Sequence, residues 1–151
     1  MKKLLYSSFL LLGLMFVSCD DDGEDNPTVC IVEDDFNLIR TWNFQTVDAE
    51  GQIGGVDQSD KDNNPSGFVT FNEDGTGIFD FEINLLSRDF GKIDPITWTR
   101  ESDKLVRIIE SDGDVLDWNL IRANEGLVEA SWHLSITSAD FATFTAVLTP
   151  E

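Results

Sequence analysis

Histidine is a common catalytic base, and the chain contains one, His133. Nucleophilic catalysis of the Ser–His–Asp or Cys–His type needs a histidine next to the nucleophile. His133 lies in an alternating run in which Trp132 and Leu134 take the opposite face. We therefore expect His133 to face solvent beside Glu129, as a surface residue and not as a catalytic base.

Metal ligands are also sparse, because a zinc site needs several His or Cys residues. The stretch DKDNNPSG begins like an EF-hand loop, with Asp60, Asp62 and Asn64 at alternate positions. Pro65 stands where that loop requires glycine, and Phe71 stands where it requires a bidentate Glu, so the motif fails. A looser cation site in this acidic stretch is the metal hypothesis that is left, and we predict no metal and no cofactor.

Carboxylates are abundant, with 29 Asp and Glu residues in the chain. A glycosidase would need two of them close together at its active site. Most acids fall at outward positions or in turns, where a solvated surface is the default, and the alternation shows no inward pair. The sequence therefore predicts that the protein is not an enzyme.

Aromatic rings are the remaining chemical feature, and many of them share one face of the alternating segments. In a small barrel such rings either fill the core or line a pocket for a small hydrophobic ligand near one mouth. Both interpretations stay open, and the second would use residues 50–67 as a lid. The nine residues are Trp42, Phe44, Phe71, Phe79, Phe81, Trp98, Trp118, Trp132 and Phe144.

The segments that carry these rings alternate between apolar and polar residues, which is the signal of half-buried strands. Turn residues such as Asp74-Gly75 separate neighbouring segments and indicate antiparallel hairpins. Residues 50–67 are too polar and glycine-rich for a confident strand, so we predict a long loop there. About eight strands are expected, at residues 41–47, 67–72, 76–83, 96–101, 105–110, 115–122, 127–136 and 142–148.

Eight sequential hairpin-linked strands favour one all-β domain over residues 35–151, built as an eight-stranded antiparallel up-and-down barrel. A two-sheet β-sandwich is the alternative, but it would need long crossovers between its sheets. The motifs LIRTWNF, TFNEDGTGIF and FTAVLTPE resemble the lipocalin-like domains of bacterial envelope lipoproteins. That resemblance implies a calyx, sometimes with an apolar cavity, and it assigns no catalytic residue. Arg40 stands where the first motif of that family usually has glycine.

The N-terminus has the pattern of a targeting signal. Lys2 and Lys3 precede an apolar run, densest over residues 9–17, that is shorter than the roughly 20 residues of a membrane span. We therefore interpret residues 1–18 as a signal peptide. The run ends in FVSC, which resembles the signals of bacterial lipoproteins, and this resemblance implies lipid attachment at Cys19. An ordinary signal peptide with an incidental cysteine is the alternative.

Residues 19–34 are expected to form an acidic flexible tether, because DDDGEDNPT has too few apolar side chains to offset its ordering entropy. Acids directly after a lipidated cysteine also resemble the surface-export signal of one group of Gram-negative lipoproteins. In other lineages Asp at that place means retention at the inner membrane, so the address depends on the lineage. We favour the outer membrane of the cell envelope, on either its periplasmic or its outer face. Cys30 would then be the remaining cysteine, and we interpret it as a small packing residue. Without lipidation, a Cys19–Cys30 disulfide is open.

Net charge limits the partners. Removal of residues 1–18 leaves 8 basic and 29 acidic residues, which gives a formal charge of −21. Nucleic acid is excluded as a partner, because neutralising phosphates needs Lys and Arg. Lying flat on an anionic membrane is disfavoured for the same reason, so the expected membrane contact is the lipid anchor. The sequence does not identify a protein partner.

Overall fold

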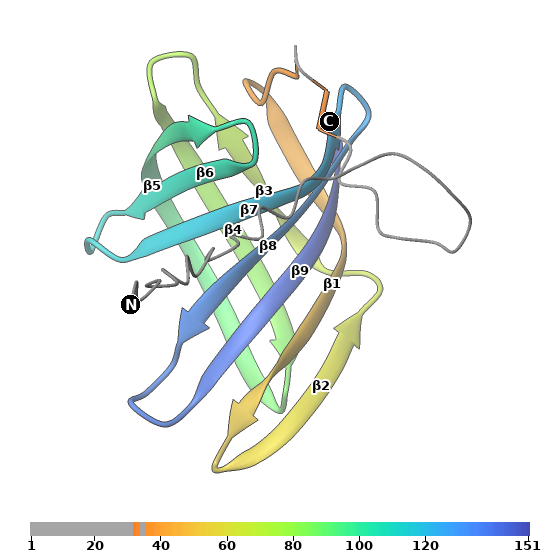
Figure 1. Cartoon of the computed structure of the whole chain (residues 1–151), viewed down its shortest axis with the longest axis vertical. Coiled ribbons are helices and arrows are strands. Elements are labelled where there is room, and N and C mark those ends of the chain that lie inside the picture. The colour runs from red at the N-terminus through yellow and green to blue at the C-terminus, as the bar shows by residue number, and fades with distance from the viewer. Residues whose placement is uncertain (1–31, 34–35) are drawn as a thin grey trace, which may run out of the picture.

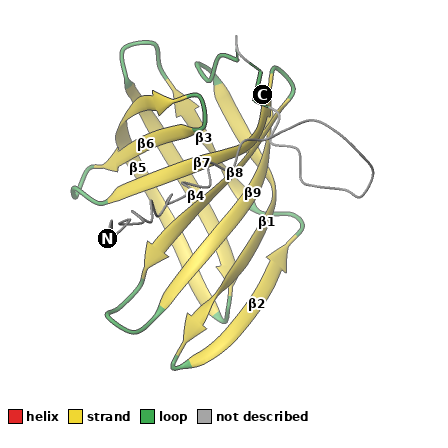
Figure 2. Ribbon diagram, viewed as in Figure 1, coloured by secondary structure: helices red, strands yellow, loops and turns green. Residues whose placement is uncertain are grey.

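Nine β-strands and no helix form the part of the chain that this computed structural model describes, residues 32–33 and 36–151 (Figures 1 and 2). The predicted signal peptide, Cys19, Cys30 and the first part of the predicted tether lie outside these residues. Nothing helical within these ranges has the length and hydropathy of a membrane span. The strands are β1 (Thr41–Ile53), β2 (Val56–Asp62), β3 (Ser66–Phe71), β4 (Thr76–Leu85), β5 (Arg88–Ser102), β6 (Leu105–Glu110), β7 (Val115–Asn124), β8 (Leu127–Ser135) and β9 (Phe141–Pro150).

Eight of the strands close into an antiparallel barrel. Their order is β1-β3-β4-β5-β6-β7-β8-β9, and β9 pairs with β1 from Gln52↔Phe141 to Trp42↔Pro150. Figure 1 shows these strands wrapping around one interior. The predicted up-and-down barrel is confirmed. The pairing of β1 with β9 closes the sheet, so the alternative two-sheet sandwich is excluded.

Side-chain alternation explains this closure, because each strand presents one apolar face to the interior. In β4 the side chains of Phe79, Phe81 and Ile83 are buried, while Asp80 and Glu82 lie on the other face. All eight segments in which the sequence shows alternation are strands of the barrel. A period of two therefore gives both the strands and the side of each strand that faces the core.

The loop predicted over residues 50–67 is wrong. β1 continues to Ile53, Gly54 and Gly55 turn the chain with φ values of 62° and 77°, and β2 returns along β1 from Ile53↔Val56 to Val47↔Asp62. This ninth strand lies beside the barrel wall, so it is not a lid (Figure 1). The sequence does not predict β2, because its side chains are mostly exposed and polar and show no apolar alternation. Backbone pairing with β1 holds this strand in place.

One end of the barrel is plugged by the segment that precedes β1. Phe36 and Leu38 are buried, and Trp42 Nε1 donates a hydrogen bond to the Leu38 carbonyl at 2.9 Å. Arg100 Nη1 reaches the Phe36 carbonyl at 2.6 Å. Val32 forms a parallel bridge with Ala123 of β7, so contacts with the barrel begin within the predicted tether.

At the opposite end of the barrel, hydrogen bonds to aspartate side chains connect the turns between neighbouring strands. Asp140, in the β8–β9 loop, accepts the Gly54 amide at 2.9 Å and Arg88 Nη2 of β5 at 3.0 Å. Asp60 of β2 also accepts the Leu86 amide in the β4–β5 turn, at 3.0 Å. These bonds hold the hairpin tips together at this end of the barrel, which we call the clasped end.

Candidate ligand pocket

Unequal hairpin lengths open the side of the barrel near its clasped end. β5 pairs with β4 from residue 88 onward, but it pairs with β6 only from Ile96. β8 likewise stays on β9 as far as Ser135, whereas its pairing with β7 stops at Ser131. The β6–β7 hairpin thus turns back early, as Figure 1 shows, and leaves a gap in the wall between β5 and β8.

A pocket of about 270 Å³ lies behind this gap. Its apolar wall comes from five strands, and acidic side chains and one lysine stand among the lining residues. The apolar lining is Phe79, Phe81, Phe90, Leu116, Trp132, Leu134 and Phe144. The remaining lining residues are Asp89, Gly91, Lys92, Glu110 and Asp114.

Stacked rings make the inner wall of the pocket rigid. Trp132 lies between two aromatic rings, with centroid distances of 5.1 Å to Trp118 and 5.4 Å to Phe144 and interplanar angles of 19° and 21°. Phe90 meets Phe144 edge-on at 5.1 Å. These are the favourable offset and edge-to-face distances of aromatic pairs, so the wall is well packed without a ligand.

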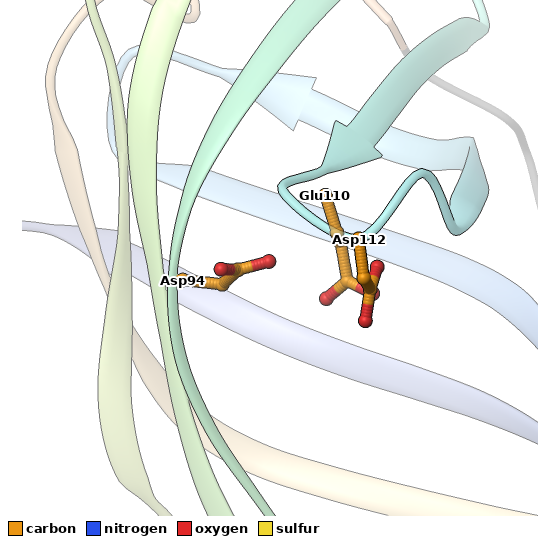
Figure 3. A group of neighbouring side chains, drawn as sticks. All are labelled: Asp94, Glu110 and Asp112. Carbon is orange, nitrogen blue, oxygen red and sulfur yellow. The ribbon is translucent and has the colours of Figure 1, made fainter.

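Three carboxylates converge at the rim, where β5 meets the β6–β7 turn. Figure 3 shows Asp94 of β5 directed toward Glu110 and Asp112. The Lys92 ammonium lies among them, with Nζ at 3.0 Å from Glu110 Oε2, 2.8 Å from Asp112 Oδ2 and 3.5 Å from Asp94 Oδ2. Ser111 donates its backbone N–H to Asp94 Oδ2 at 2.8 Å and its hydroxyl to Asp94 Oδ1. We call Lys92, Asp94, Glu110 and Asp112 the rim cluster.

The rim cluster sets the protonation of its members. Burial opposes the charge on Lys92, but hydrogen bonds to Asp112 and Glu110 outweigh it and raise the pKa of the ammonium. Burial raises the pKa of Glu110 above its usual value, although Lys92 opposes that rise. The Ser111 hydroxyl and amide lower the pKa of Asp94, and Lys92 lowers the pKa of Asp112. Lys92 is therefore a firmly held internal counter-ion.

The three carboxylates of the rim cluster have oxygens within 4.8 Å of one another, which is close enough to hold a metal ion. Within the described ranges they are the one group of this kind. Lys92 already supplies a positive charge among them, so we assign no metal to it. Asp60 and Asp62, where the sequence left a loose cation site, accept backbone amides instead, from Leu86 and Asn64.

The expectation that no two acids point inward together is wrong. Asp94 and Glu110 are 5% and 8% exposed and share the rim cluster. Alternation continued from Ile96 back along β5 places Asp94 and Lys92 on the inward face, but the strand predicted from the sequence begins only at residue 96. In β6, where apolar residues fall on both faces, Ile108 and Glu110 are buried and Ile109 is exposed.

The nine predicted aromatic residues fall into three groups. Phe79, Phe81, Trp132 and Phe144 line the pocket, together with Phe90, Leu116 and Leu134, which were not proposed as ligand contacts. Trp98 is half-buried and donates Nε1 to the Asn72 and Thr76 carbonyls, both at 3.1 Å, beside the β3–β4 turn. The other four, which pack in the interior behind the pocket or near the plugged end, are Trp42, Phe44, Phe71 and Trp118.

His133 is exposed on the outer face of β8, as the alternation predicts. Its Nδ1 lies 3.3 Å from Thr143 Oγ1, and its ring lies 5.5 Å from that of Phe141. These neighbours stand on β9 and outside the pocket, so the histidine takes no part in the candidate site.

Fold and site together define the class of the protein, which is a closed antiparallel β-barrel with a ligand-sized aromatic pocket in its side. No family model matches the sequence, and no curated protein matches it either.

Proposed function

We propose that this protein is a lipid-anchored lipoprotein of the cell envelope whose barrel binds a small hydrophobic ligand without catalysing a reaction. The observation that carries the proposal is the lateral pocket of about 270 Å³ with its aromatic wall. Small-molecule sites are mostly apolar cavities of about 300–1,000 Å³ with a few polar groups. The lining of this pocket fits that description, and its volume lies just below the lower end of that range, which favours a ring-sized ligand over a long acyl chain.

The absence of catalysis is proposed from the state of the acids at the rim. Asp94 is hydrogen-bonded through both oxygens to Ser111, and Glu110 and Asp112 both hold Lys92. A general base or nucleophile needs a carboxylate oxygen free to meet the substrate. In the rim cluster each of the three carboxylates is instead already engaged by a donor of the protein.

The envelope location is proposed from the N-terminal sequence pattern and from the resemblance to lipocalin-like domains of envelope lipoproteins. Val32, where contacts with the barrel begin, lies thirteen positions after Cys19. Such a length spans at most about 45 Å. The anchor would thus hold the pocket close to the membrane surface, where hydrophobic molecules partition.

Binding is tested with a ligand panel of small aromatic and alicyclic compounds, followed by tryptophan emission and calorimetry. Trp132 lines the pocket and stacks on Trp118, so a bound ligand should change the emission. Leu134→Trp places a larger side chain in the pocket and should weaken binding at least about tenfold. Val115→Trp adds the same ring at an exposed position and serves as the control.

The binding proposal is wrong if no compound of the panel changes the emission or gives heat with the intact protein. It is also contradicted if Leu134→Trp and Val115→Trp bind the ligand equally well, since the ligand would then occupy another place. Circular dichroism of both variants shows whether the barrel is intact.

An interaction module is the second candidate, and it is favoured by apolar side chains on the outer face of neighbouring strands. Ile93 is 76% exposed on β5, and Ile78, Ile109 and Val115 are exposed on β4, β6 and β7. An envelope protein or glycan is the partner class for this candidate. Pull-down from membranes with the full chain should recover such a partner, and an Ile93→Ser variant should recover less of it. Recovery of nothing would argue against this candidate.

A further inference from the structure

We propose that the ligand of the lateral pocket carries a positive charge, as a protonated amine attached to a ring-sized apolar body. This inference rests on the proposed function, because it concerns the ligand of the same pocket. Its basis is the contrast between an aromatic wall and an acidic rim whose one lysine is already fully engaged.

Lys92 does not provide an anion site although it lines the pocket. Its ammonium donates hydrogen bonds to Glu110 and Asp112 and lies 3.5 Å from Asp94. An anionic group entering the pocket would have to displace these carboxylates from Lys92. A second cation near this end, Arg88, is paired with Asp140 at 3.0 Å.

The charge around the opening is strongly negative. Two further carboxylates, Asp89 and Asp114, line the pocket beside the rim cluster. Five carboxylates and one lysine therefore line or border the pocket, and four of the negative charges remain unbalanced when all of these groups are ionised. A cleft lined by one sign of charge with low-dielectric walls concentrates its potential. It attracts a cation and repels a fatty acid or another anion.

The aromatic wall behind the rim suits the same ligand. Phe81, Phe90, Trp132 and Phe144 line the pocket within the reach of a small molecule held at the rim. Ring faces attract cations, and the attraction grows when the cation is desolvated. An amine at the opening would thus meet Glu110 and Asp114, while its apolar body would lie against the rings.

Three probes of similar size separate charge from shape: phenethylamine, phenethyl alcohol and phenylacetate. Calorimetry at low salt should give phenethylamine at least about tenfold tighter binding than phenethyl alcohol, and no binding of phenylacetate. The amine affinity should also fall as salt is added, because the attraction is partly screened. Equal or tighter binding of phenylacetate would overturn the inference.

Variants show whether the preference comes from the rim. Glu110→Gln and Asp114→Asn should each weaken phenethylamine several-fold and leave phenethyl alcohol unchanged. Glu73→Gln removes one carboxylate from the β3–β4 turn at the plugged end, and it should change neither affinity. A fall in amine affinity with Glu73→Gln as large as with the rim variants would show a general charge effect and would contradict the inference.

The panel used for the proposed function distinguishes the two proposals. If neutral compounds bind and amines do not, the pocket binds a ligand and the inference about charge is wrong. If compounds of every charge fail to bind, both proposals are wrong.

Discussion

Glu110 is a charged residue at an inward position of β6, where the two preceding inward positions carry the apolar side chains of Val106 and Ile108. Its side chain is buried at the rim, and burial holds its pKa above the usual value of 4.5. A carboxyl with a raised pKa binds its proton more tightly in the folded chain than in the unfolded chain. Between pH 4.5 and the raised pKa its ionisation therefore lowers the free energy of unfolding as pH rises.

Glu110→Gln removes this ionisation and keeps a hydrogen-bonding side chain. We expect the free energy of unfolding of the variant, relative to the natural protein, to increase from pH 4.5 to pH 7. Urea unfolding followed by circular dichroism at several pH values measures this difference. A difference that stays constant or decreases over this interval would contradict the raised pKa.

Asp112→Asn is the matched control, because Lys92 lowers the pKa of Asp112 below its usual value of 3.8. A lowered pKa contributes stability that is present above 3.8 and is lost as pH falls through the folded value. The variant lacks this contribution. The free energy of unfolding of the variant, relative to the natural protein, should therefore decrease as pH rises from the lowered pKa of Asp112 to 3.8. This change is opposite in sign to the effect of Glu110→Gln.

At the scale of the elements, Asp140 decides how firmly the hairpin tips hold together at the clasped end. Asp140→Ala removes the acceptor of both Gly54 N–H and Arg88. The ion pair is partly exposed and contributes little by itself, while the loss of both acceptor contacts should cost about 1–2 kcal/mol of unfolding free energy. Amide exchange at Gly54 should also become faster.

Asp57→Ala provides the comparison, because Asp57 lies in the β1–β2 hairpin that Asp140 contacts through Gly54. Asp57 accepts one exposed hydrogen bond, from Gln52 at 3.2 Å, so its removal should change stability by less than about 0.5 kcal/mol. Equal losses for the two variants would mean that Asp140 does not clasp these elements.

Most of the barrel could be predicted from the sequence because its strands bury one face. Runs such as 76–83 and 127–136 alternate clearly, and both are strands in the structure. β2 could not be found in this way, since its stability comes from backbone pairing with β1 and its side chains are largely exposed.

The sequence predicts the aromatic wall of the pocket but not its acidic rim. Phe81 and Trp132 follow the alternation and could be placed on its wall. The rim could not, because it depends on how far β5 extends beyond β6, and hairpin length is set by pairing rather than by hydropathy. Lys92 and Asp94 can be placed on the inward face only if the alternation that starts at Ile96 is continued toward the start of β5.

At the scale of the whole molecule, the net charge of the barrel disfavours contact with the membrane, so attachment depends on the proposed lipid anchor. Residues 36–151 carry 21 acidic and 8 basic side chains, a formal charge of −13. This part of the chain should be repelled by anionic lipid headgroups. Under the proposed function, the lipid on Cys19 is then the contact that holds the protein on the membrane.

Cys19→Ala tests this arrangement. The natural chain should sediment with membranes, incorporate labelled palmitate and resist washing with high salt, because several acyl chains hold it there. The variant should lose the label and leave the membrane fraction. Cys30→Ala, which changes the other cysteine of the chain, should behave like the natural protein in all three assays.

Two outcomes would contradict the anchor at Cys19. Label that persists in Cys19→Ala would place the lipid elsewhere, and label that disappears in Cys30→Ala would implicate the second cysteine. Because the barrel lies beyond the proposed anchor, the purified Cys19→Ala chain should still bind the pocket ligand with the affinity of the natural protein. Membrane attachment and ligand binding would thus be separable, as expected for a barrel that is held near the membrane only by its tether.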